Sequence, residues 1–165
     1  MKNFVEFFAG VGLVREGLSK SSWDCVWAND ISPDKQETYV ENYGNEDFWL
    51  GDIWDAAKDS NLIPDNTFLY TASFPCTDLS VAGGRAGLAG KESGTLNALI
   101  EILKNKRKIG SAPKVVLLEN VKGFLTSHKG KDVEQTVKHF SELGYFVDII
   151  ELDAIDFSAQ SRPRV

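Results

Sequence analysis

Two cysteines in this sequence have different surroundings. Cys76 follows Pro75 in the stretch SFPCTDLS (73–80), between an apolar run and a glycine-rich segment, whereas Cys25 lies inside the apolar stretch DCVWA. A cysteine within an apolar strand usually behaves as a small buried hydrophobic residue. A thiol just beyond a strand end, near amide dipoles and a cation, can instead ionise and attack an electrophilic carbon. We therefore expect Cys25 to be structural and Cys76 to be a candidate nucleophile.

A carboxyl group and two guanidinium groups could complete such a site. Glu119 follows the apolar run KVVLL, and Arg162 and Arg164 lie in QSRPRV. A partly desolvated carboxyl can share a proton with a nitrogen heterocycle while a thiolate adds to the ring. Arginine suits carbonyl and phosphate oxygens because its planar fork donates several hydrogen bonds. The alternatives are a salt bridge between Glu119 and one of the arginines, and a solvated charged tail.

The pattern of apolar segments predicts the sheet that would position these residues. Segments rich in Val, Phe, Ile and Leu alternate with amphipathic stretches, which is typical of an α/β fold with a Rossmann-like, doubly wound, mostly parallel sheet. Such sheets bind ligands at the carboxyl ends of their strands. We predict strands at 4–8, 24–28, 68–73, 114–118 and 145–152, and helices at 13–19, 33–43, 95–106 and 131–143.

Two acidic residues, Asp30 and Asp52, are candidates to bind a nucleoside near a glycine turn. The stretch FFAGVGL (7–13) has only a G-x-G spacing, but Asp30 ends the second strand 18 residues after Gly12. An acidic residue there can accept hydrogen bonds from ribose hydroxyls, or it can cap the helix that opens near Pro33. In GDI (51–53), Asp52 could receive an adenine amino group and Ile53 could pack against the ring, or Asp52 could be an ordinary turn residue.

The composition is that of one globular domain spanning residues 1–165. Of the 165 residues 42% are hydrophobic and 25% charged, and no apolar run approaches the roughly 20 residues of a membrane-spanning helix. Glu6 interrupts the apolar N-terminal stretch and the cysteines lack metal-ligand spacing, so we expect a soluble, cytoplasmic protein without a secretion signal or metal site. The net charge of −6 disfavours holding nucleic acid by overall charge but leaves room for a local basic strip.

Over nearly the whole chain, these motifs resemble those of the C5-cytosine DNA methyltransferases, in the family's order. EFFAGVGL resembles the cofactor loop, WANDISP the ribose segment, GDI the adenine segment and SFPCTDLS the Pro-Cys nucleophile motif. SGTLNALIEIL resembles the helix after the nucleophile loop, LLENVKGF the Glu-Asn-Val motif and AQSRPRV the Gln-x-Arg-x-Arg motif.

The resemblance implies S-adenosylmethionine as the cofactor. Asp30 would bind the ribose, Asp52 the adenine amino group, and the amides of residues 10–13 would lie near the methionine part. Phe8, Ile31 and Ile53 would contact adenine. The full set of cofactor residues implied is Phe8, Ala9, Gly10, Val11, Gly12, Leu13, Asp30, Ile31, Asp52, Ile53 and Phe74.

The resemblance also implies a mechanism on a cytosine rotated out of double-stranded DNA, because the ring face is inaccessible while stacked. Cys76 would add to carbon 6, Glu119 would share a proton with ring nitrogen 3, and Arg162 or Arg164 would hold the ring carbonyl and a phosphate. Carbon 5 would take the methyl group, and loss of its proton would expel the thiol. Ser80 and Arg85 would contact DNA, and no metal is needed.

Some features depart from the family pattern. Leu13 replaces a frequent glycine, and Ser158 and Ala159 replace Gly-Val-Pro. The family's target-recognition domain and closing motifs would follow Val165. We therefore expect a fragment, or one subunit whose second chain brings that domain, with little or no methylation activity alone. Site-specific restriction and modification is the role expected of the whole enzyme.

Three alternatives share part of the pattern. A tRNA-directed relative would keep the same chemistry, but its motif usually reads Pro-Pro-Cys, whereas Phe74 precedes Pro75 here. A catalytically inactive binding module would have no chemical need for the cysteine, glutamate and arginines together. An NAD-dependent enzyme would share the glycine turn and Asp30 but would leave that constellation unexplained.

Overall fold

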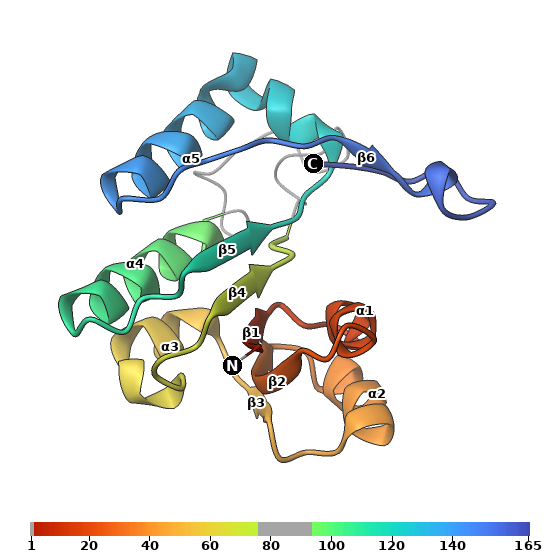
Figure 1. The fold of residues 1–165 in the computed structure, drawn as a ribbon, viewed down its shortest axis with the longest axis vertical. Coiled ribbons are helices and arrows are strands. Elements are labelled where there is room, and N and C mark those ends of the chain that lie inside the picture. Colours follow the sequence, from red (N-terminus) through yellow and green to blue (C-terminus); the bar gives the residue numbers. More distant parts are fainter. Residues whose placement is uncertain (1, 76–93) are drawn as a thin grey trace. The chain divides into compact units, whose positions relative to one another are not determined.

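The computed structural model describes residues 2–75 and 94–165 (Figure 1). The predicted roles of Cys76, Ser80 and Arg85 therefore concern residues outside the described part. The chain forms two compact units. The sheet unit comprises Met1–Ser73 and Glu101–Leu118, and the hairpin unit comprises Phe74–Ile100 and Glu119–Val165.

The described elements are short and follow one another closely. The strands are β1 (Asn3–Phe7), β2 (Asp24–Asp30), β3 (Phe48–Leu50), β4 (Leu69–Ala72), β5 (Val115–Leu118), β6 (Leu152–Asp153) and β7 (Pro163–Arg164). The helices are α1 (Leu13–Ser19), α2 (Pro33–Tyr43), α3 (Ile53–Lys58), α4 (Thr95–Lys108) and α5 (Lys131–Glu142), with 3-10 helices η1 (Ser60–Leu62), η4 (Lys122–Gly130) and η5 (Ala154–Asp156).

The sheet unit contains a five-stranded parallel sheet in the order β3-β2-β1-β4-β5. Helices α1 and α2 lie on one side of this sheet, and α3 and the second half of α4 lie on the other (Figure 1). The chain reverses its direction of travel across the sheet between β1 and β4, and such a reversal is where α/β sheets bind ligands. The predicted Rossmann-like, doubly wound α/β fold is confirmed.

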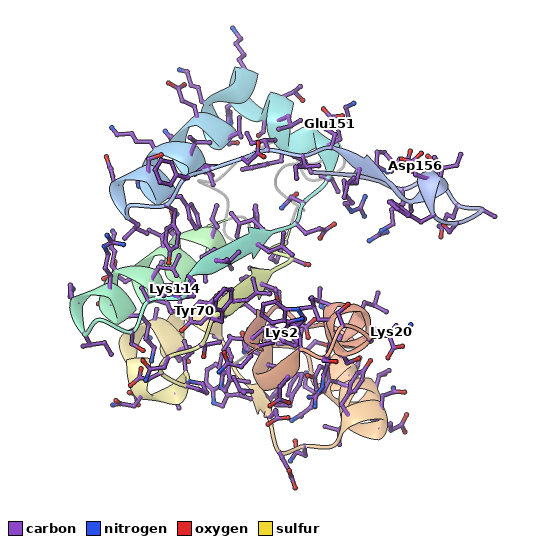
Figure 2. All side chains as sticks on the ribbon, in the orientation of Figure 1. Lys2, Lys20, Tyr70, Lys114, Glu151 and Asp156 are labelled. Atoms are coloured by element: carbon purple, nitrogen blue, oxygen red, sulfur yellow. The ribbon has the colours of Figure 1, made fainter. Side chains whose placement is uncertain are left out.

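Burial of the central strands explains their apolar sequences. Phe4, Val5 and Phe7 of β1 are fully buried, as expected for a parallel strand covered on both faces. Figure 2 labels Tyr70 of β4, whose ring meets Phe7 edge-on with centroids 5.3 Å apart. These aromatic contacts fix β1, and with it the turn that follows β1 at the carboxyl edge.

A buried lysine ties α4 to the loop before β4. The Lys106 side chain is 1% exposed, and its Nζ donates to the Ile63 carbonyl and to Asp65 Oδ1, both at 2.6 Å. A buried ammonium is tolerated when hydrogen bonds and an opposite charge replace its water. The lysine thereby anchors α4 beside β4.

The hairpin unit contains η4, α5 and the antiparallel β6–β7 pair. The predicted strand at 145–152 is wrong, because residues 146–151 form no β-ladder with any described residue and only Leu152–Asp153 is strand. A strand persists only where a neighbour accepts its backbone hydrogen bonds. Here the described partner is only two residues long and begins with Pro163, which has no N–H.

Gly12 is a position where the turn requires glycine. Its φ is +85° at the N-cap of α1, and an added Cβ would meet the Tyr43 ring and lie 3.0 Å from Tyr39, which is fully buried. We predict that Gly12→Ala lowers the free energy of unfolding by about 3 kcal/mol, from the left-handed backbone and the clash together. Urea unfolding measures this change.

The matched control is Gly17→Ala in the same helix, where an added Cβ meets nothing within 4 Å and φ is not positive. This substitution should raise stability by up to about 1 kcal/mol, because alanine favours the helix. Equal effects of the two substitutions would contradict the role assigned to Gly12.

Candidate functional site

The glycine turn lies at the carboxyl end of β1 and leads into α1. Its backbone includes left-handed residues at Phe8 (φ 56°), Gly10 (φ 58°) and Gly12 (φ 85°). The Ala9 amide donates to the Asn29 carbonyl at 2.8 Å, and the Gly12 amide donates to the Ala9 carbonyl at 2.9 Å. Nothing lies within 4 Å of a Cβ placed on Gly10, so the described residues leave room for a ligand against this turn.

The Asp30 carboxylate joins this turn to the start of α2. Oδ2 accepts the Gly10 amide at 2.9 Å, and Oδ1 accepts the Ser32 amide at 3.0 Å. Lys35 Nζ lies 3.4 Å from Oδ2, and the Asp30 side chain is only 4% exposed. Ser32, rather than Asp30, is the N-cap of α2. Asp30 therefore holds two backbone segments together, a positioning role that sequence reasoning did not foresee.

The second acidic residue, Asp52, caps α3. Its Oδ1 accepts the Trp54 amide at 2.9 Å. Asn29 holds the preceding residue, because its Nδ2 donates to the Gly51 carbonyl at 2.8 Å. Asp52 therefore has a structural role as a helix N-cap, where the sequence suggested an ordinary turn residue as the alternative to an adenine ligand.

The apolar residues near this edge differ in how much surface they offer. Ile31 and Leu13 are 64% and 74% exposed, and Val11 is 39% exposed. Ile53, predicted to contact adenine, is only 3% exposed and retains little surface for a ligand. Trp54 is 41% exposed next to Asp52 and was not foreseen. An aromatic residue directly after GDI was the signal that could have identified it.

In the hairpin unit, Glu119 and Arg164 form a close ion pair. Arg164 Nε lies 2.6 Å from Glu119 Oε1, with side-chain exposures of 24% and 39%. The main chain aligns them, because Asn120 and Val165 exchange backbone hydrogen bonds of 2.9 and 3.0 Å and Val121 bridges Arg164. The salt bridge considered from the sequence is therefore present, with Arg164 as the partner. The guanidinium fixes the orientation of the Glu119 carboxyl through a charge-assisted hydrogen bond.

Asn120 fixes the residues that precede Pro75. The side chain is buried, its Nδ2 donates to the Phe74 carbonyl at 3.1 Å, and its Oδ1 accepts the Val121 amide at 2.8 Å. Phe74 is 3% exposed and meets Phe124 edge-on, so the aromatic ring predicted to contact the cofactor lies in the core of this unit. Asn120 is a second positioning residue that sequence reasoning missed.

Arg162 is exposed, and the hydrogen bond that it donates goes to Asp153 and not to a member of the Glu119–Arg164 ion pair. Its backbone amide donates to Asp153 Oδ1 at 2.6 Å, and this bond is the main reason that the pKa of Asp153 lies below its usual value. Ser161 also donates to Asp153, at 2.9 Å. Figure 2 shows Glu151 just before β6, and this residue pairs with Lys122 at 2.6 Å. Asp153 and Glu151 thus fasten the arginine-containing hairpin.

Comparison with known proteins identifies the family. The family model described as C-5 cytosine-specific DNA methylase matches residues 2–165. The chain belongs to the C-5 cytosine-specific DNA methylase family. Similar proteins include two type II methyltransferases. M.BsuFI of Bacillus subtilis is 35% identical to this chain over 159 residues, and M.HhaI of Haemophilus parahaemolyticus is 31% identical over 163 residues.

The matches cover most of this methylase chain and part of each relative. The two alignments span 96% and 98% of the chain but 36% and 47% of the relatives. Among solved structures, the S. pombe Dnmt2 methyltransferase has a TM-score of 0.78 at 26% identity, covering 99% of this chain and 49% of that one. The chain therefore spans less than half of the length of each of these three proteins.

Within 2–75 and 94–165, no helix has the length and apolar character needed to cross a membrane. The same residues contain no cluster of three His, Cys, Asp or Glu side chains arranged to hold a metal ion.

Proposed function

We propose that this chain is the catalytic portion of an enzyme that methylates carbon 5 of cytosine in DNA with S-adenosylmethionine, through a covalent adduct on Cys76. The observation that carries the proposal is the Glu119–Arg164 pair at 2.6 Å, aligned by its own backbone hydrogen bonds within the Glu-Asn-Val and Gln-x-Arg-x-Arg motifs. The type II methyltransferases among its relatives support a site-specific restriction and modification role.

The sheet unit fits the proposed cofactor. The glycine turn has open space at Gly10, exposed apolar side chains at Leu13 and Ile31, and an acidic residue at Asp52. Asp30 is 4% exposed, so at the ribose end of the site it would offer only the edge of its carboxylate, and it keeps the turn in place through Gly10. When bound, S-adenosylmethionine supplies an electrophilic methyl group. The residues of the turn would hold the cofactor in one orientation, with its methyl group directed at the acceptor carbon.

The remaining chemistry falls to the residues of the nucleophile and hairpin segments. The Cys76 thiolate adds to carbon 6 of the flipped cytosine, and the Glu119 carboxyl shares a proton with ring nitrogen 3, which makes carbon 5 nucleophilic. Arg164 orients Glu119, and Arg162 is available for the ring carbonyl or a phosphate. After carbon 5 is methylated, loss of its proton restores the ring and releases the Cys76 thiolate. Ser80 and Arg85 would contact DNA.

The test compares nucleic acids and assemblies. Labelled methyl transfer is measured to duplex DNA and to tRNA, by the 165-residue chain alone and by an assembled enzyme in which the C-terminal part of the Haemophilus parahaemolyticus relative is fused or added. We expect transfer to cytosine carbon 5 of DNA by the assembled enzyme and little by the chain alone. Transfer to tRNA instead would show that the substrate is wrong, and no adduct with 5-fluorocytosine DNA would favour an inactive binding module.

Asp30 carries a prediction that needs no catalytic turnover. Asp30→Ala removes the acceptor of the Gly10 and Ser32 amides in a buried site, so we expect S-adenosylmethionine to bind at least about 10-fold more weakly and stability to fall by about 2 kcal/mol. Calorimetric titration and thermal unfolding measure the two effects. Asp34→Ala, which removes an exposed carboxylate from the first turn of α2, is the control and should alter neither by a comparable amount. Unchanged cofactor affinity in Asp30→Ala would remove Asp30 from the site.

A further inference from the structure

Glu6 is a buried carboxyl group directly beneath the glycine turn. It lies in β1, opposite Ala28 of β2 and Thr71 of β4, and is only 2% exposed. The backbone amides of Val14 and Arg15, in the first turn of α1, hydrogen-bond to the carboxyl. Its Oε2 is buried without a hydrogen-bond partner among the described residues. This carboxyl therefore receives only part of the hydrogen bonding that an ionised group needs.

Burial raises the pKa of Glu6 to about 7, against the opposing influence of the two amides and of the Arg15 guanidinium. Ionisable groups face it from three elements. Arg15 comes from α1, Cys25 from β2 and Tyr43 from α2.

The Arg15 guanidinium is already engaged elsewhere. It donates to Tyr39 Oη at 2.9 Å and to Asp47 Oδ2 at 3.2 Å. Burial raises the pKa of Cys25 to about 11, and it also raises the pKa values of Tyr39 and Tyr43. These three groups stay neutral between about pH 6 and 8. Glu6 is the member of this cluster that changes charge there.

We propose that Glu6 positions the glycine turn and releases a proton when S-adenosylmethionine binds, so that affinity for this cofactor rises with pH. The inference rests on the proposed cofactor site. The cofactor brings a sulfonium and an ammonium, and positive charge near a carboxyl favours its ionised form. By linkage, the ionised carboxyl favours the bound cofactor to the same extent.

The sign follows from the two protonation equilibria. Without cofactor the carboxyl is largely protonated below its pKa of about 7. With cofactor it ionises at lower pH, so binding at intermediate pH releases a proton. Affinity therefore increases as pH rises through the value of the free protein and levels off above it.

Calorimetric titration of the 165-residue chain tests this linkage. We expect wild-type affinity for S-adenosylmethionine to be about 3- to 10-fold higher at pH 8 than at pH 6, and Glu6→Gln to reduce this ratio below about 2-fold. The amino group of the ligand titrates in both proteins, so their difference isolates Glu6. S-adenosylhomocysteine, which lacks the sulfonium charge, should show a smaller ratio with the wild type.

Glu16→Gln is the matched control, because Glu16 is an exposed residue of the same helix, paired with Lys20 at 3.0 Å, and its replacement should preserve the wild-type ratio. Proton release is also measured in two buffers of different ionisation enthalpy. Equal proton release by wild type and Glu6→Gln, or equal pH ratios in the two proteins, would overturn the inference. Absence of cofactor binding at every pH would instead overturn the proposed cofactor site.

Discussion

Cys76→Ser is expected to abolish methyl transfer by the assembled enzyme, lowering its rate on the order of 10³-fold or more. A serine hydroxyl is far less acidic than a thiol, so it supplies almost no anionic nucleophile near neutral pH. DNA containing 5-fluorocytosine should form a covalent adduct with the wild type, because fluorine at carbon 5 cannot leave as a proton does. The adduct should be absent with Cys76→Ser. Denaturing gel electrophoresis of labelled DNA measures it.

The second cysteine provides the control for this experiment. Cys25 is 5% exposed, its Sγ lies 3.6 Å from the Trp27 carbonyl, and burial raises its pKa to about 11. Cys25→Ala should therefore leave adduct formation in place even if it lowers stability. An adduct that survives Cys76→Ser but disappears in Cys25→Ala would reverse the roles assigned to the two thiols.

Glu119→Gln is expected to slow methyl transfer by about 10²- to 10⁴-fold. Glutamine has nearly the same shape and can still accept a hydrogen bond from Arg164, which lies 2.6 Å from the carboxylate. It cannot carry the proton that ring nitrogen 3 requires when the thiolate adds. The rate of adduct formation with 5-fluorocytosine DNA should fall in parallel, since the defect lies in the addition step.

Two further variants separate this chemistry from a loss of charge alone. Glu101→Gln removes a carboxylate from an exposed pair with Lys104, 3.5 Å apart, and should keep near wild-type rates. Arg164→Ala leaves the Glu119 carboxyl without its partner and should slow transfer less than Glu119→Gln, because the proton-sharing group remains. A Glu119→Gln enzyme with an unchanged rate of adduct formation would exclude Glu119 from the addition step.

The sequence predicted the sheet and the helices flanking it where local signals were strong. The ends of α1 and α2 agree with prediction, and a proline lies at the first turn of α2. Segment 145–152 has strand composition, but pairing depends on a neighbouring strand that residue types within the segment cannot reveal. Helix α3 has six residues, too few to show a helical period, and was not predicted.

The site was harder to predict because side-chain partners come from distant parts of the chain. Asp30 was singled out as a ribose ligand or a helix cap, but its bond to Gly10 joins residues 20 positions apart. Glu6 was noticed only as a polar interruption of an apolar stretch, whereas its burial follows from strands on both sides of β1. Asn120 was noted within its motif, yet its contact with Phe74 spans 46 positions.

The reciprocal hydrogen bonds between Asn120 and Val165 have a consequence for conformational entropy. Long charged side chains usually lose rotamer freedom when they meet, and that loss cancels much of their attraction. Here the two backbones are already joined one residue from each charge, so Glu119 and Arg164 start close together. Little further ordering would remain if a base bound here as proposed, because the main chain already sets the orientation of the carboxyl.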